Sequence, residues 1–196
     1  MSDGFFHWYR RTWSAGSAER VVEAFEANGI VLTNPSTGVI TAISNGPESW
    51  GEQIAVERSE LFAALELKFA DEVNFQLWLD ADTDVFTRIR RLDQADMTVV
   101  EFGLDGMTAD ERETVIRAAR QAFARDREDT TGLVIDRRGL SEDVDWDGVM
   151  TGQDVRLDIH PDFFGVRPEV VARHPQLADA PGRAEPPLVV FSRDLL

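Results

Sequence analysis

Three runs of alternating apolar and polar residues between residues 73 and 104 constrain the fold of this chain more than any other feature. The runs cover residues 73–79, 85–92 and 98–104, and short acidic turns at 80–84 and 93–96 separate them. Alternate side chains of a β-strand lie on the same face of a sheet, so each run predicts a strand with one buried and one solvated face. Strands joined by such short turns form an antiparallel meander.

Two segments predict helices that pack on this sheet. Residues 108–111, Thr-Ala-Asp-Glu, form a capping box, and the apolar residues that follow at helical spacing predict a helix over Ala109–Arg125. Ser17 stands at an N-cap position and Asn28-Gly29 supplies a stop signal, so a second helix is predicted at Ala18–Asn28.

The remaining segments predict shorter elements. The N-terminal strand is aromatic, and we interpret its rings as core residues, with a ligand cleft as the alternative: Phe5, Phe6, Trp8, Tyr9 and Trp13. Further strands are predicted at 30–33, 39–44, 50–58, 131–136, 155–159 and 188–191. Residues 59–69 fit a helical turn or two that runs into extended chain.

Together these elements predict an α+β fold with an antiparallel, meander-type sheet packed on one face by two main helices. Residues 1–162 are predicted to form a single α+β domain, a size that one hydrophobic core can support. Five prolines interrupt residues 163–196. We therefore expect an irregular C-terminal extension, packed on the same domain, with at most a short helix at Glu169–Arg173.

The chain is strongly acidic, with 36 acidic and 20 basic residues and a net charge of -16. Its hydrophobic content of 43% is too high for a disordered acidic polypeptide. Such a charge repels nucleic acid and anionic membranes and attracts a basic protein, so we expect a basic protein partner. The candidate partner-binding acids gather in turns: Asp80, Asp82, Asp84, Glu142, Asp143, Asp145 and Asp147, with Asp93 and Asp96 at a further turn. Turn aspartates also bind nearby backbone amides, which is the alternative explanation for each of them.

One acidic segment has the spacing of a calcium loop. Asp143, Asp145 and Asp147 alternate before Gly148, and Asp154 stands at the twelfth position. An EF-hand has a glutamate at that last position. The alternative is an acidic turn anchored in the core by Trp146.

No sequence motif points to catalysis. The chain lacks the nucleophile, phosphate-binding and dinucleotide-binding motifs and has no cysteine, and His7, His160 and His174 are scattered. We therefore expect a non-enzymatic protein without a cofactor, although so many acids leave a carboxylate-pair site open. With no secretory signal or membrane span in the sequence, a cytoplasmic location is expected. The sequence does not define the oligomeric state.

The run Gly132-Leu133-Val134-Ile135-Asp136-Arg137, which leads to Asp145-Trp146-Asp147, resembles stretches of the immunity proteins of polymorphic-toxin systems in GC-rich bacteria. The resemblance covers roughly residues 73–150. It implies an inhibitor that covers the active site of a cognate toxin, often a nuclease, with acids of the turns mimicking phosphates. The alternatives are a nucleic-acid-mimicking regulator of a DNA-binding protein, and a calcium-dependent or small-molecule binding module.

Overall fold

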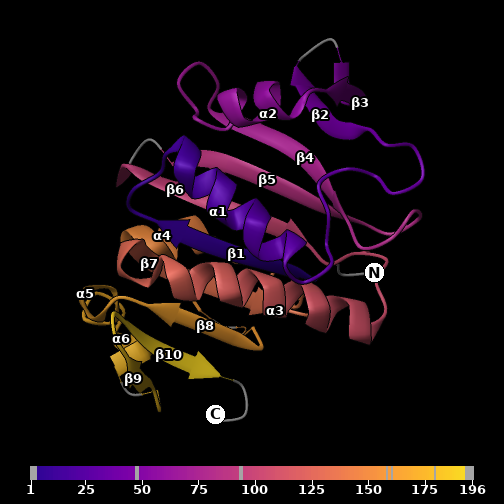
Figure 1. Cartoon of the computed structure of the whole chain (residues 1–196). Helices are drawn as coiled ribbons and strands as arrows, with labels where there is room; N and C mark the ends of the chain where they lie inside the picture. The colour runs from indigo at the N-terminus through magenta and orange to yellow at the C-terminus, as the bar shows by residue number, and fades with distance from the viewer. Residues whose placement is uncertain are drawn as a thin grey trace.

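The computed structural model describes residues 4–46, 49–92, 95–157, 159, 161–178 and 180–192. Asp93 and His160 lie outside the described residues. In this part of the chain ten strands form one antiparallel sheet in the order β3-β2-β4-β5-β6-β1-β7-β8-β10-β9 (Figure 1). In chain order the first six strands are β1 (Phe5–Arg10), β2 (Ile40–Gly46), β3 (Ser49–Val56), β4 (Glu72–Trp78), β5 (Asp84–Leu92) and β6 (Met97–Gly103). The last four are β7 (Thr130–Asp136), β8 (Phe163–Val166), β9 (Arg183–Glu185) and β10 (Leu188–Ser192).

The predicted meander is confirmed, because β4, β5 and β6 are neighbours in the sheet and follow one another in the chain. Its register pairs Phe75 with Thr87 and Ile89 with Val100. Those four side chains are buried on one face of the sheet. The period-two pattern therefore predicted both the strands and which of their side chains point into the core.

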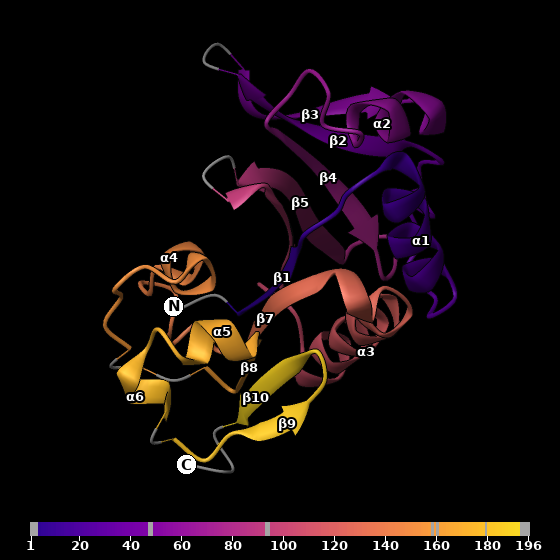
Figure 2. The same ribbon diagram turned by 90° about the vertical axis from the view of Figure 1, so that its left-hand side faces the viewer.

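Helices cover both faces of the sheet (Figure 2). The central strand β1 contributes alternate side chains to the core on each face. Phe6 and Trp8 join a core that contains residues of α1 (Ala15–Glu26), α2 (Arg58–Ala64) and α3 (Ala109–Arg125). Phe5 and Tyr9 join a second core with α4 (Trp146–Thr151), α5 (Pro168–Val171) and α6 (Pro175–Ala178). The prediction that these rings are core residues is confirmed, and the α+β class is confirmed with it.

The helices follow their local signals closely. The Thr108 side chain accepts from the Glu111 amide and the Glu111 carboxylate accepts from the Thr108 amide, so α3 begins with the predicted capping box. The N-terminal helix begins earlier than predicted, at Ala15, because Ser14 rather than Ser17 is its N-cap. Ser14 Oγ accepts from the Ser17 amide. None of the helices in the described residues is long and apolar enough to cross a bilayer.

The predicted strand at 188–191 is confirmed as β10, but the prediction that the rest of the C-terminal extension is irregular is wrong, because residues 163–192 also add β8 and β9 to the sheet. The prolines lie at the ends of elements: Pro168 and Pro175 are first in α5 and α6, and Pro186-Pro187 lies in the β9–β10 turn. Proline is tolerated at a helix start and in a turn, so it does not interrupt these short strands.

Two other predicted strands do not form as expected. Residues 155–157 and 159 are not in a strand, although Leu157 is buried in the second core. Residues 30–33 make only isolated bridges, from Val31 to Trp78 and from Thr33 to Ile40. The segment at 30–33 therefore bridges the end of β4 and the start of β2 without forming a strand of its own.

Candidate partner-binding surface

Charged side chains line the face of the meander that is turned away from α1 and α3. They come from alternate positions of β4, β5 and β6, and the strand register brings Arg88 beside Asn74 and Glu101. His7 on β1 lies opposite Glu101 on the same face. This face carries polar side chains because only part of it is covered by the C-terminal helices.

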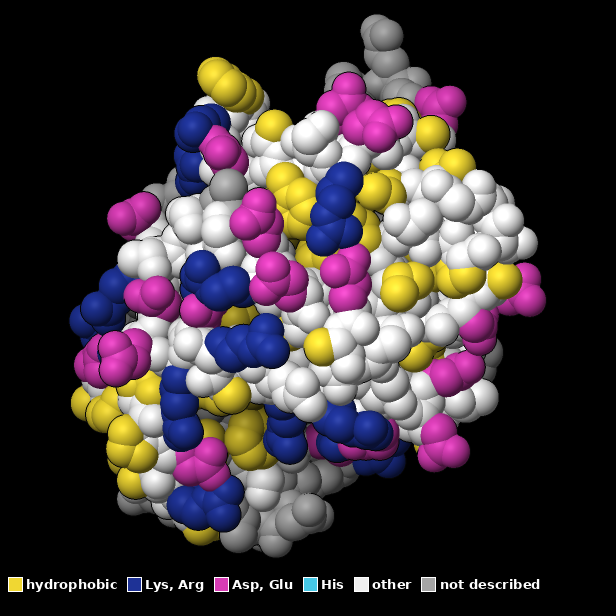
Figure 3. Space-filling view, viewed as in Figure 1, with side chains coloured by type: hydrophobic (Ala, Val, Ile, Leu, Met, Phe, Trp, Pro, Cys, Tyr) yellow, Lys and Arg dark blue, Asp and Glu magenta, His cyan; other side chains and the backbone are white. Residues whose placement is uncertain are grey.

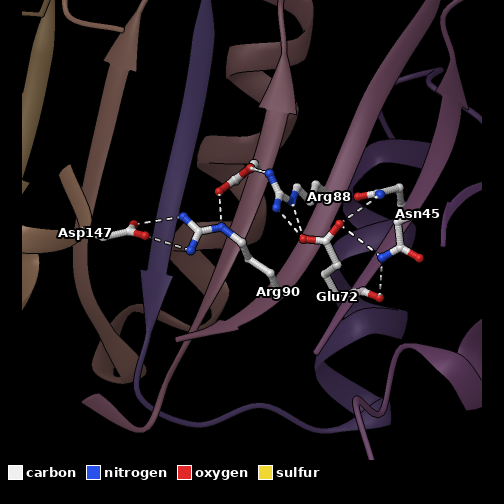
Figure 4. A network of polar contacts seen from close by, with 7 residues as sticks. Asn45, Glu72, Arg88, Arg90 and Asp147 are labelled. Carbon is white, nitrogen blue, oxygen red and sulfur yellow. Dashed lines mark hydrogen bonds and ion pairs between the residues drawn. The ribbon is translucent and has the colours of Figure 1, made fainter. Parts of the chain in front are cut away.

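An ion-pair network crosses this face from β2 to α4 (Figure 4). Asn45 Nδ2 donates to Glu72 Oε1 at 3.1 Å, and Arg88 Nε donates to Glu72 Oε2 at 2.9 Å. Glu101 lies between the two arginines, 3.8 Å from Arg88 Nη1 and 2.5 Å from Arg90 Nε. The other end of Arg90 reaches α4.

Asp147 on α4 completes the network. It accepts from Arg90 Nη1 and Nη2, both at 2.8 Å, and from the Tyr9 hydroxyl at 2.9 Å. Burial raises the pKa of Asp147, but the hydrogen bonds and the charge of Arg90 outweigh it, so the pKa lies below its usual value. Burial and the Asp147 charge both raise the pKa of Tyr9. At neutral pH the carboxylate is charged and the phenol is neutral.

The segment with calcium-loop spacing adopts a different local structure. Asp145 is the N-cap of α4 and accepts from the Gly148 amide at 2.8 Å, while Asp147 lies inside the helix. Gly148 stands where a side chain does not fit, since a Cβ there would lie 2.5 Å from Asp145 Oδ2. Trp146 is buried in the second core, as the alternative interpretation predicted, and donates to the Ser141 carbonyl at 3.1 Å.

The carboxylates of this segment do not form a metal-binding group. Asp143 and Asp154 are exposed, and Asp147 is occupied by Arg90. Within the ranges that the structure describes, no group of three or more His, Cys, Asp or Glu residues could hold a metal ion. The geometry gives calcium binding no support.

The other acids predicted to bind a partner lie at one end of the sheet. Asp80, Asp82 and Asp84 occupy the β4–β5 turn, where Asp80 Oδ1 accepts from the amides of Asp82 and Thr83 at 2.8 Å. Those hydrogen bonds lower the pKa of Asp80. Asp84 accepts from Gln76 at 2.8 Å. Asp80 therefore binds backbone amides, as the alternative explanation predicted, and Asp80 and Asp82 are exposed to solvent.

Glu142 and Asp143 lie in the loop that follows β7, and both are exposed. A buried carboxylate holds this loop: Asp136 Oδ2 accepts from the amide and the hydroxyl of Ser141, both at 2.7 Å. Because Asp136 is only 1% exposed, these hydrogen bonds lie in a region of low dielectric and hold the start of the loop firmly. The backbone next to Glu142 is therefore fixed.

Glu142 borders a hollow of about 300 Å³ at this end of the sheet, and we name it the acidic hollow. Its residues come from β1, β5 and β6 and from the loops that follow β6 and β7: Gly4, Phe5, His7, Phe86, Glu101, Phe102, Gly103, Asp105 and Glu142. Phe86 is 40% exposed although it is a large apolar side chain. Three carboxylates and an exposed ring therefore surround one opening.

His7 forms part of the wall of the acidic hollow. Its Nδ1 atom is buried and has no hydrogen-bond partner among the described residues. Burial lowers the pKa of His7, against the opposing effects of Glu101 and Asp147, so the imidazole is neutral at pH 7. A neutral imidazole can accept a hydrogen bond at a nitrogen that carries no proton.

Sequence reasoning missed His7, Phe86, Glu101 and Asp105 as parts of this surface. The available signal was the polar half of each period-two run, together with an apolar Phe86 at a position predicted to face water. Their meeting depends on the pairing of β1 with β6, which are far apart in the chain.

Charge is unevenly distributed over the molecule (Figure 3). In this view acidic side chains follow the right-hand edge, and others lie at the top, in the centre and along the left-hand edge. Arginines cross the lower part of the face, over α3 and the C-terminal strands, and some pair with acids there, as Arg137 does with Glu113. On this face the negative charge is therefore not confined to one end of the sheet, and the turn acids are only part of it.

The fold and surface define an α+β protein built on a ten-stranded antiparallel sheet, with Asp80, Asp82, Asp105 and Glu142 at one end, which we call the acidic end. No protein-family model and no curated protein matches the chain. Over 97% of its length the chain is similar to the solved structure of the Pseudomonas aeruginosa T6SS protein PA0821, with 11% sequence identity and a TM-score of 0.49. The chain spans 64% of that protein. This similarity is too remote to assign a function.

Proposed function

We propose that this is a non-enzymatic binding protein, and specifically an immunity protein that neutralises a cognate toxin by stoichiometric binding through its acidic end. The observation that carries the proposal is the acidic hollow, in which Glu101, Asp105 and Glu142 surround the exposed Phe86. We expect the protein to act in the cytoplasm.

The arrangement suits a basic protein partner for two physical reasons. Protein interfaces concentrate their binding energy in a few residues, and an exposed aromatic ring beside a hollow is a typical anchor. Acids around it attract a cationic surface and raise the rate of association by roughly tenfold to a thousandfold. The turn acids Asp80, Asp82 and Asp84 lie at the same end and extend this field beyond the hollow.

A lysine or arginine side chain of the partner fits the hollow best. A guanidinium can stack on the Phe86 ring while it donates to the exposed Glu142 carboxylate. Glu101 adds negative charge to the wall, but its carboxylate is already paired with Arg90 and Arg88. Asp147 is not part of this contact, because its carboxylate is already paired with Arg90.

The test is capture of the partner from the source cells with the tagged protein, followed by mass spectrometry and affinity measurement. We expect a basic protein with toxic activity that the wild-type chain inhibits at one-to-one stoichiometry. The variants Glu142→Lys and Asp82→Lys should weaken the complex at least about tenfold, because each reverses a charge that faces the partner.

The matched control is Glu19→Lys, which makes the same charge change on the exposed surface of α1, away from the acidic end. It should bind as the wild type does. Equal binding by all three variants would contradict the proposal, as would the absence of any basic protein among the captured ones. Capture of a general DNA-binding protein instead of a toxin would favour the nucleic-acid-mimicking regulator.

A further inference from the structure

A second hollow, of about 270 Å³, lies between α3 and the C-terminal strands. We name it the arginine pocket after Arg120, Arg127 and Arg183, which line it together with Glu185 and apolar residues. In a chain with a net charge of -16, three arginines around one opening are unexpected. Figure 3 shows apolar side chains with arginines around them in this part of the face, below α3.

The floor of the arginine pocket is apolar because the sheet continues beyond α3. Leu133, Leu188 and Val190 belong to the core on the α3 side of the sheet, and Phe163 packs against it. Gly165, between these strands, adds no side chain, and a Cβ there would lie 3.0 Å from Leu188 Cδ1. The floor therefore consists of close-packed aliphatic groups beside one aromatic ring.

Arg120 lies over this floor without a counterion. Its guanidinium carbon is 5.1 Å from the centre of the Phe163 ring, and it forms no hydrogen bond or ion pair with any residue that the structure describes. Partial burial and the charge of Arg137 lower the pKa of Arg120 more than Glu113 and Glu185 raise it. A guanidinium in such a position has several donors available for a ligand.

The other two arginines share one carboxylate. Arg183 pairs with Glu185, and Arg127 Nη2 lies 4.0 Å from the same side chain. Arg127 Nε is buried and has no hydrogen-bond partner among the described residues. The arginine pocket thus has three cations and one anion, and two of its arginines have unused donors.

We infer that the arginine pocket binds a small organic carboxylate with an apolar body, such as a short fatty acid or an aromatic acid. Arginine is the side chain that best recognises a carboxylate, through paired charge-assisted hydrogen bonds. The aliphatic floor and Phe163 accommodate the apolar part, and the volume is close to the lower limit for small-molecule sites. This site is independent of the acidic hollow, which lies on the other face of the sheet.

Isothermal titration with octanoate tests the inference on the full chain. We expect octanoate to bind at one site, whereas acetate, which lacks the apolar body, and octylamine, which has the opposite charge, do not. Arg120→Gln and Arg127→Gln should each weaken octanoate binding at least about tenfold, because each removes charge-assisted donors.

Arg117→Gln is the matched control, since it removes one arginine from the exposed surface of the same helix without changing the pocket. Ala124→Trp tests the cavity itself, because Ala124 lines the opening and is exposed, so a larger side chain blocks the site without entering the core. Circular dichroism and the melting temperature confirm that the variants are folded. Absence of octanoate binding at millimolar concentration, equal binding by Arg120→Gln, or equal binding of octylamine would overturn the inference.

Discussion

Asp147 and Arg90 form a bidentate ion pair, with both nitrogen–oxygen distances at 2.8 Å, across 57 residues of sequence. The pair ties the short helix α4 to the polar face of the meander. It is largely buried, since the side chains are 17% and 31% exposed for Arg90 and Asp147. Glu101 and Tyr9 satisfy the remaining polar groups of the two residues.

We predict that Asp147→Ala lowers the free energy of unfolding by about 3 kcal/mol, because it leaves the Arg90 charge partly buried with Glu101 as its one remaining ion-pair partner among the described residues, and it also removes the acceptor of the Tyr9 hydroxyl. Urea denaturation at neutral pH measures the change. Asp143→Ala, an exposed acid in the same segment, should change stability by less than about 0.5 kcal/mol. A double-mutant cycle with Arg90→Met isolates the pair, and a coupling energy near zero would show that the two residues stabilise the fold independently.

His7 gives the protein a pH-dependent stability. Burial lowers the pKa of His7 in the folded state below the value of about 6.5 that histidine has in an unfolded chain. Between these two pKa values the unfolded state binds more protons, so stability falls as the pH decreases below about 6.5 and levels off beneath the folded pKa. Glu101 and Asp147 oppose this shift, while Arg88 and Arg90 add to it.

The measurement is the free energy of unfolding at several pH values between about 7.5 and 5. In His7→Gln the loss of stability over this range should be smaller than in the wild type, because the titrating group is absent. The carboxylates of Asp147 and Glu72 do not interfere, since their lowered pKa values place their own effect at more acidic pH. An unchanged pH profile in His7→Gln would show that another group causes the dependence.

The sequence predicted those parts of the fold that local signals specify. The capping box at Thr108 and the period-two runs of the meander are each encoded within a few residues. The bounds of α3 and the strands β4 to β6 could therefore be predicted from the sequence. Ser17 was predicted as the N-cap although it lies in the first turn of α1, because both serines precede the apolar residues of the helix and Ser14 is the one that caps it. The strand β8 was missed since four residues that include a glycine carry too little pattern.

The candidate sites were harder to predict from the sequence, because they depend on the order of the strands in the sheet. Arg90 meets Asp147, and His7 meets Phe86 and Glu142, only after β1 has inserted between β6 and β7. The spacing of Asp143, Asp145 and Asp147 predicted oxygen ligands converging on an ion. The same spacing places Asp145 at a helix cap and Asp147 within the helix, where their side chains serve different contacts.

Gly148 packs against the Asp145 side chain that caps α4. We predict that Gly148→Ala lowers stability by about 2 kcal/mol, because the new Cβ would lie 2.5 Å from Asp145 Oδ2 and 2.7 Å from Val155 Cγ2. Millimolar calcium should leave the melting temperature of the wild type within about 1 °C of its value with chelator, since a bound ion would raise it. A calcium-dependent rise in melting temperature would restore the calcium interpretation.

Phe86 and Glu142 should contribute to partner binding in kinetically different ways. Phe86→Ala removes an aromatic anchor that is 40% exposed, so we expect faster dissociation of the basic partner captured by the wild type, by about tenfold or more, with little change in association. Glu142→Gln removes a charge at the rim, so it should slow association and reduce the dependence of that rate on salt. Surface plasmon resonance at two salt concentrations separates the two effects.

Ile54→Ala is the control for Phe86→Ala, because Ile54 on β3 is 44% exposed and lies several strands away from the acidic hollow. Its kinetics should match those of the wild type. If Phe86→Ala and Ile54→Ala change dissociation equally, or neither changes it, the partner does not use the acidic hollow. If Glu142→Gln leaves the salt dependence of association intact, the charge at this end of the sheet does not attract the partner.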